Sequence, residues 1–295
     1  MDIWTIMQVA GVLGAAVLGA LYYFQDKLLY FPGMPPGAKE NFFKPVLFGF
    51  KESDWEEVFF RTKDNVKIQS WLFKRGEKGV ATLVFFHGNA GNLSHRLENI
   101  RKLFSLGVNV LIVSYRGYGK SEGTPSEKGI KLDAQAALHF LSQREDLDPS
   151  KLILFGRSLG GAVAAFLAHH SQKNHEKEGK GRGGEERVGV KGVILENTFT
   201  SVPEMLDVVF PALSPLKFLV SNEWNTLKLV GEIECPILFL SGEKDQLVPN
   251  RMMRKLYQLS KDATFVTFPS GTHMDLPFMP NYYNTIHKWI LKLHL

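Results

Sequence analysis

The stretch KLILFGRSLGGAVAA, residues 151–165, contains a short apolar strand, a Gly-x-Ser-x-Gly turn and a helix of small residues. A serine on such a tight turn has strained backbone angles, so the residues two before and two after it must be very small. Gly156 and Gly160 meet that need. The turn lifts the Ser158 hydroxyl above the sheet and directs the Leu159 amide toward any oxyanion formed there. We therefore predict that Ser158 is a nucleophile. The alternative is a Gly-rich turn with an incidental serine.

The composition is that of a globular protein of 295 residues, with 44% hydrophobic and 22% charged residues. The net charge is +5, but the basic residues are scattered. This pattern indicates solubility or mild attraction to an anionic membrane, and it argues against nucleic-acid binding. The single cysteine, Cys235, excludes an intrachain disulfide, and no spacing of cysteine and histidine suggests a metal site. We expect neither a metal nor a cofactor.

The N-terminal residues 3–24 carry no formal charge. A helix of this length measures about 33 Å, enough to cross a hydrocarbon core of about 30 Å. Trp4 at one end and Tyr22 at the other are typical interfacial residues. A cleaved signal peptide is the alternative, but the stretch lacks a basic start and a good small-residue cleavage site. We expect a retained single-pass anchor over residues 1–27 and a Pro/Gly-rich linker over 28–54.

The lysines beyond the anchor bear on its orientation. Lys27, Lys39 and Lys44 follow the apolar stretch, whereas Asp2 precedes it. The positive-inside rule then favours a cytosolic C-terminal domain, although this bias is weak for a single anchor. We expect the protein in an endomembrane, such as the endoplasmic reticulum, or in the plasma membrane.

Strand and helix patterns alternate from residue 55 to the C-terminus. Residues 57–62 and 66–73 flank a turn and predict an antiparallel hairpin at a sheet edge. Continuous apolar runs predict buried strands, and amphipathic stretches between them predict helices. The result is a doubly wound, mostly parallel sheet in one domain over 55–295. The expected strands are 81–86, 109–113, the run before Ser158, 192–195, 236–240 and 263–268, and the expected helices include 94–106, 124–143 and 281–293.

Three local features refine this pattern. Thr124, followed by proline and then Glu127, reads as a capping box with proline at the first helical position. Residues 171–187 contain no large apolar side chain and four glycines, so we expect a disordered insertion. Residues 199–230 are rich in apolar side chains, and we expect a small cap-like segment there. Its apolar residues either line an acyl pocket or pack against the core.

An acid and a base for Ser158 are expected where later strands end. Asp245 follows the strand at 236–240, with Glu243 as its rival. Asp133 is a third candidate, on an amphipathic helix, where we expect it to be solvated. His273 follows the last strand, and the resulting order, serine then acid then histidine, favours it over the other eight histidines.

A second oxyanion donor is expected in the loop after the strand at 81–86. This loop reads HGNAGN from His87. Its glycines allow the backbone to approach a substrate, and the amide of Asn89 is the candidate partner for the amide of Leu159. His87 is expected to brace the loop by hydrogen bonds.

Taken together, the motifs resemble the membrane-anchored serine hydrolases of the α/β-hydrolase domain-containing protein 13 type, over nearly the whole chain. The matching stretches are GRSLGG (156–161), FHGNAGN (86–92), YRGYGKSEG (115–123), ENTF (196–199), DQLVP (245–249) and GTH (271–273). The charged loop after His170 is longer than expected for such proteins.

This resemblance implies an α/β-hydrolase fold, the triad Ser158, Asp245 and His273, and no cofactor. It implies substrates such as acyl esters, lysolipids or S-acylated proteins at a lipid bilayer. The alternatives are a serine peptidase and a membrane-tethered scaffold without activity.

Overall fold

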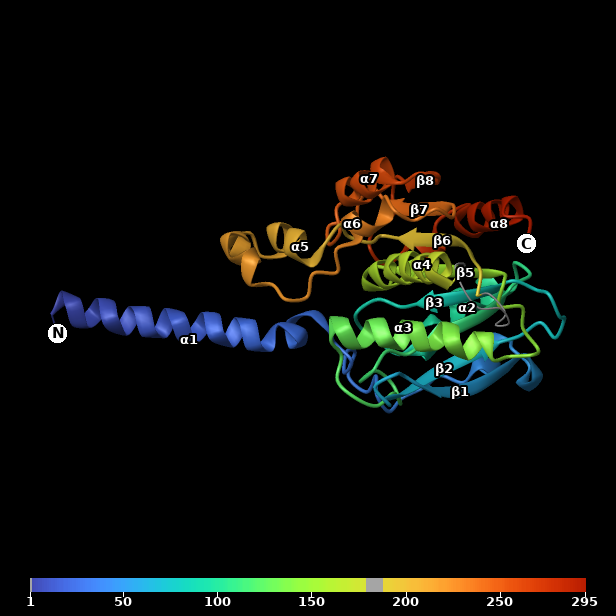
Figure 1. Cartoon of the computed structure of the whole chain (residues 1–295), viewed down its shortest axis with the longest axis horizontal. Coiled ribbons are helices and arrows are strands. Elements are labelled where there is room, and N and C mark those ends of the chain that lie inside the picture. Colours follow the sequence, from blue (N-terminus) through green and yellow to red (C-terminus); the bar gives the residue numbers. More distant parts are fainter. Residues whose placement is uncertain (1, 179–187) are drawn as a thin grey trace.

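The computed structural model describes residues 2–178 and 188–295. Within them an eight-stranded sheet is flanked by helices, and one long helix projects away from it (Figure 1). The strand order is β1-β2-β4-β3-β5-β6-β7-β8. The strands are β1 (Trp55–Arg61), β2 (Lys67–Phe73), β3 (Thr82–Phe86), β4 (Asn109–Val113), β5 (Leu152–Arg157), β6 (Val190–Glu196), β7 (Ile237–Gly242) and β8 (Ala263–Phe268).

The sheet confirms the predicted fold class. Strand β2 pairs antiparallel with both β1 and β4, and all later neighbours pair parallel. Because side chains alternate across a strand, β3 sends Val84 to one face and Phe85 to the other. The first face packs against α3 (Glu127–Ser142), α4 (Leu159–Glu178) and α7 (Asn250–Leu259), and the second against α2 (Leu97–Phe104) and α8 (Tyr282–Lys292).

Two predicted boundaries are wrong. Helix α3 begins at Glu127, because Ser126, and not Thr124, is the N-cap: its Oγ accepts a hydrogen bond of 3.1 Å from the Gly129 amide. Helix α4 continues to Glu178, so residues 171–178 are not a disordered loop. That stretch consists of helix-compatible polar residues, and the first glycine comes only at 179. The rest of the predicted insertion, 179–187, lies outside the described residues.

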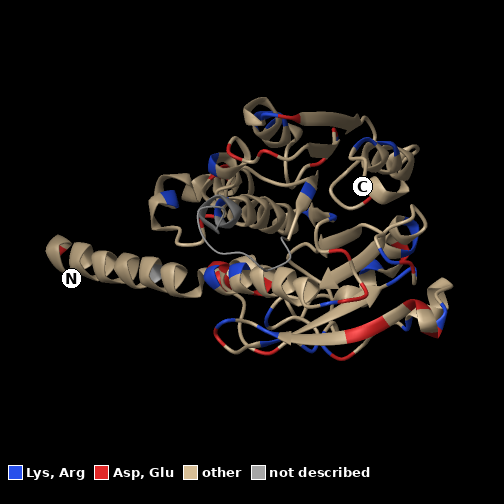
Figure 2. Ribbon diagram, turned by 45° about the vertical axis from the view of Figure 1, so that its right-hand side comes forward, with Lys and Arg blue, Asp and Glu red and all other residues tan. Residues whose placement is uncertain are grey.

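The N-terminal helix α1 (Ile3–Leu29) is 27 residues long, and it is the one helix in the described residues that is long and apolar enough to cross a membrane. Figure 2 shows no charged position along it between Asp2 and its C-terminal end. Residues 28–54, expected as a linker, pack against the domain. Tyr30, Ala38 and Phe50 are all buried, and short 3-10 helices η1 (Pro45–Phe48) and η2 (Glu52–Asp54) lead into β1.

The cap segment, residues 199–230, forms α5 (Val202–Val209), the 3-10 helix η4 (Pro211–Leu219) and α6 (Thr226–Val230). It projects from the domain on the side from which α1 leaves (Figure 1). Met205 and Val208 of α5 pack against the core, whereas Phe210 and Phe218 are exposed. The remaining short helices are η3 (Leu93–Arg96) and η5 (Leu276–Phe278).

Candidate active site

Ser158 lies on the tight turn between β5 and α4, with a φ of +53°. An L-residue rarely adopts this conformation, which is typical of strained functional turns. The turn leaves no room for side chains beside it: a Cβ on Gly156 would collide with the Gly160 carbonyl, and a Cβ on Gly160 with the Phe86 carbonyl. The Ser158 amide donates a hydrogen bond of 2.9 Å to the Glu196 carbonyl of β6, which holds the turn against the sheet.

The three residues predicted as a triad form a chain of hydrogen bonds. The Ser158 hydroxyl donates to His273 Nε2 at 3.1 Å, and His273 Nδ1 donates to Asp245 Oδ2 at 2.7 Å. The second oxygen of Asp245 accepts hydrogen bonds from the amides of Leu247 (2.9 Å) and Val248 (2.8 Å). Asp245 is therefore a fixed, buried acceptor that holds His273 in the tautomer able to take a proton from Ser158.

The two rival acids lie elsewhere. The Glu243 side chain is 40% exposed and lies 3.9 Å from Arg254. Asp133 is fully buried, so the expectation that it is solvated is wrong. It accepts hydrogen bonds from the Arg116 amide (2.8 Å) and side chain (2.9 Å), and Arg116 also pairs with Asp64 at 2.8 Å. Asp133 thus fastens α3 to the loop after β4.

The end of β6 supports all three triad residues. Thr198 Oγ1 donates a hydrogen bond of 2.7 Å to the Ser158 carbonyl. The Asn197 side chain donates to the Thr272 carbonyl at 3.0 Å and accepts from the Gly242 amide at 2.9 Å. Asn197 therefore joins the loop that carries the histidine to the strand that precedes the acid. The sequence drew attention to these residues through the ENTF motif but assigned them no role.

Arg157, next to Ser158, contacts the loop that carries His273, and no sequence motif predicts this contact. Its guanidinium donates to the His273 carbonyl at 2.6 Å. It lies 3.4 Å from Glu196, whose other oxygen accepts a hydrogen bond of 2.7 Å from Tyr282. Arg157, Glu196 and Tyr282 are all buried. The second position of the Gly-x-Ser-x-Gly turn therefore carries a charged side chain that holds the backbone of His273.

Leu159 follows Ser158 directly in the sequence, and Asn89 follows Gly88, which lies close to Ser158 in space. Leu159 begins α4, and Gly88 lies 3.7 Å from the Ser158 Cβ, measured from an ideal Cβ on the glycine. Within residues 2–178 and 188–295, neither the Leu159 amide nor the Asn89 amide has a hydrogen-bond acceptor. Both are thus free to donate to a ligand.

The loop that carries Asn89 is fastened to the end of the N-terminal helix. The Asn89 side chain donates to the Leu29 carbonyl at 3.0 Å, and the Asn89 carbonyl accepts from the Phe31 amide at 2.9 Å. Farther along, Gly91 donates to the Met34 carbonyl at 2.7 Å. No local sequence pattern predicts these contacts.

His87 at the base of this loop is fully buried between Tyr115 and Tyr118. Its Nδ1 donates to the Gly88 carbonyl at 2.6 Å, and Tyr115 donates to the His87 carbonyl at 2.7 Å. Burial lowers the pKa of His87 to about 3. The side chain is therefore neutral near pH 7 and supports the loop, as the sequence suggested.

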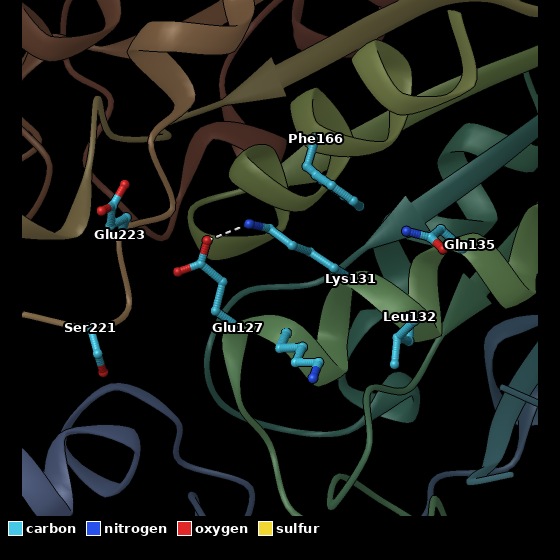
Figure 3. Close-up of a pocket in the computed structure, with 8 residues that line it drawn as sticks. Glu127, Lys131, Leu132, Gln135, Phe166, Ser221 and Glu223 are labelled. Atoms are coloured by element: carbon cyan, nitrogen blue, oxygen red, sulfur yellow. Dashed lines mark hydrogen bonds and ion pairs between the residues drawn. The ribbon is translucent and has the colours of Figure 1, made fainter. Parts of the chain in front are cut away.

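A pocket of about 520 Å³ away from the triad lies between α3, α4 and residues 221–223. Figure 3 shows that Glu127 and Lys131 point toward each other there, and their ion pair measures 2.5 Å. Glu127 also accepts a hydrogen bond of 3.1 Å from the Trp224 amide. The pocket therefore lies beside the contact between α3 and the cap segment, and the triad does not line it.

Comparison with known proteins identifies the family to which the chain belongs. A family model described as alpha/beta hydrolase fold matches residues 81–207. The α/β-hydrolase domain-containing protein WAV2 of Arabidopsis thaliana is 41% identical over 282 residues, which cover 90% of this chain and 85% of that protein. This chain belongs to the α/β-hydrolase family. A further member, the uncharacterized membrane protein YNL320W of Saccharomyces cerevisiae, is 35% identical over 93% of this chain and 92% of its own.

Solved α/β-hydrolase structures agree in fold. An α/β-hydrolase from Vibrio vulnificus superposes with a TM-score of 0.69 at 22% identity, covering 85% of this chain and 88% of that one. The esterase Pf2001 of Pyrococcus furiosus gives 0.64 at 19% identity, covering 85% and 96%. At these identities the likeness concerns the fold alone.

Proposed function

We propose that this protein is a membrane-anchored serine hydrolase that cleaves acyl esters or thioesters through an acyl-enzyme. The hydrogen-bonded chain from Ser158 through His273 to Asp245 carries the proposal. An esterase among the structural neighbours and an apolar N-terminal helix support it. The substrates would be acyl lipids, lysolipids or S-acylated proteins at the bilayer. We place the protein as a single-pass protein of an endomembrane or the plasma membrane.

In this mechanism His273 removes the Ser158 proton as the serine oxygen attacks the acyl carbonyl. Asp245 holds the imidazole and stabilises its positive charge. The amides of Leu159 and Asn89 donate to the tetrahedral oxyanion. His273 then gives its proton to the departing alcohol or thiol, and the acyl group stays on Ser158. Water, deprotonated by the same histidine, attacks the acyl-enzyme and releases the acid.

The test is fluorophosphonate labelling of the protein in membranes. Wild-type protein should react, and Ser158→Ala should not, because removal of a catalytic serine costs on the order of 10⁶ in turnover. Ser142→Ala, at the distant end of α3, is the matched control and should keep the label. Folded wild-type protein that does not react would favour the scaffold alternative. Hydrolysis of amides in preference to esters would favour the peptidase.

A further inference from the structure

The C-terminal half of α1 lies beside the cap segment. An apolar crevice of about 90 Å³ separates the two, with leucines and Tyr22 of α1 on one side and the cap segment on the other. The lining residues are Leu18, Leu21, Tyr22, Gln25 and Leu28 of α1, and Leu206, Leu213, Leu216, Leu219 and Val220 of the cap segment.

One end of this contact is polar. The Gln25 side chain accepts a hydrogen bond of 2.7 Å from the Ser221 amide, and Asn222 donates to Asp26 at 2.8 Å. Asn222 also accepts from the buried Tyr30 hydroxyl at 2.9 Å. This end lies toward the domain, so the apolar part of the crevice lies farther out along α1.

The length of α1 determines the depth of this contact in a bilayer. A helix needs about 20 residues to cross a hydrocarbon core of about 30 Å. Residues 3–17 would provide only about 22 Å at about 1.5 Å per residue, so a spanning α1 must place Leu18 and Leu21 inside the lipid. Whatever packs against these two side chains lies at the same depth.

We propose that the cap segment is a second membrane contact, with α5 and η4 inserted into the leaflet nearest the main domain. Phe218 is 77% exposed and Phe210 is 54% exposed, and no described part of the chain covers them. Large apolar side chains exposed beside a spanning helix are expected to meet lipid. Lys217 and Asp207 on this surface form an ion pair of 3.2 Å, so their opposite charges offset each other. A lysine near a membrane can also extend its long side chain toward the lipid headgroups.

The proposal rests on the proposed span of α1 and is independent of hydrolysis. It is tested by the quenching of single fluorescent labels by nitroxide groups on lipid acyl chains. In a Cys235→Ala background, Phe218→Cys and Phe210→Cys probe the cap segment, with labelled protein reconstituted in phosphatidylcholine vesicles. Val12→Cys is the reference for α1. Leu291→Cys, a 61% exposed position on α8, is the matched control on the main domain.

We expect lipid-borne quencher to reduce the fluorescence at both cap positions, as at the α1 position, and to leave the α8 position unchanged. A reduction of fluorescence at the α1 position alone would overturn the proposal that the cap segment is inserted, and it would leave the span of α1 intact. Absence of quenching at all four positions would overturn the span and the inserted cap together. Two cap positions are used so that misfolding of one variant does not decide the result.

Discussion

The Asn89 side chain donates a hydrogen bond of 3.0 Å to the carbonyl of Leu29, the last residue of α1. The neighbouring Phe31 amide returns a bond of 2.9 Å to the Asn89 carbonyl. The loop proposed to bind the oxyanion is thus held by the residues that leave the apolar helix. The segment after the helix is therefore part of the site's support.

Removal of the hydrogen bond between the Asn89 side chain and the Leu29 carbonyl should slow the proposed ester hydrolysis. Asn89→Ala keeps the backbone amide but frees its loop, so we expect kcat on a water-soluble ester to fall on the order of 10-fold, less than the 10²–10³ for a lost oxyanion donor. KM should change little. Gln25→Ala is the control, since it loosens α1 from the cap segment without touching the loop. Equal losses in both variants would contradict the proposed role of the Leu29 contact.

The buried charges of Arg157 and Glu196, which lie near His273, should depend on each other for stability. Arg157→Met leaves Glu196 buried without its partner at 3.4 Å, and we expect a loss of about 3–5 kcal/mol in the free energy of unfolding. Adding Glu196→Gln removes that charge and retains an acceptor for Tyr282, so the double variant should be more stable than Arg157→Met alone. Urea unfolding in detergent measures the wild type, the two single variants and the double variant. Additive losses would show that the two charges do not interact.

The glycines around the nucleophile should not tolerate even a methyl group. In Gly160→Ala the new Cβ meets the Phe86 backbone, which cannot move without breaking the sheet, so we expect loss of folded protein and of fluorophosphonate labelling. Gly33→Ala is the control, because nothing lies within 4 Å of a Cβ there. Protease resistance and labelling of both variants provide the comparison. Normal labelling of Gly160→Ala would mean that the turn differs from the one described.

The buried His87 predicts a loss of stability in acid. Its pKa is about 3 in the native state, whereas the unfolded chain takes up the proton near pH 6.5. Because only the unfolded state binds this proton between those values, stability falls as the pH drops below 6.5. Between pH 6.5 and pH 5, protonation of His87 in the unfolded state lowers the free energy of unfolding by about 2 kcal/mol.

His87→Phe removes the titrating group and keeps a ring between Tyr115 and Tyr118. Its free energy of unfolding should therefore depend less on pH than that of the wild type. Urea unfolding at neutral and acidic pH measures the difference. Parallel pH profiles would mean that another group causes the acid sensitivity.

The sequence predicts those parts of the molecule that depend on local pattern and chain order. Ser158 is recognisable from its glycines, and Asp245 and His273 from their places after strands, because parallel strands bring their carboxyl ends to one edge. The contacts of Arg157 with the histidine loop, and of Asn89 with Leu29, join residues that are 116 and 60 positions apart. No periodicity records such pairs. The cap of α3 was missed because both Thr124 and Ser126 are good N-caps, and only the structure distinguishes them.

The pairing of α1 with the cap segment also affects how the chain is made. Gln25 and Ser221 are 196 positions apart, so on the ribosome the helix emerges long before its partner exists. If α1 enters a bilayer as it emerges, the α1 leucines that line the crevice first contact lipid. The cap segment replaces that lipid once it has been made. Completion of the fold then takes place at the membrane surface.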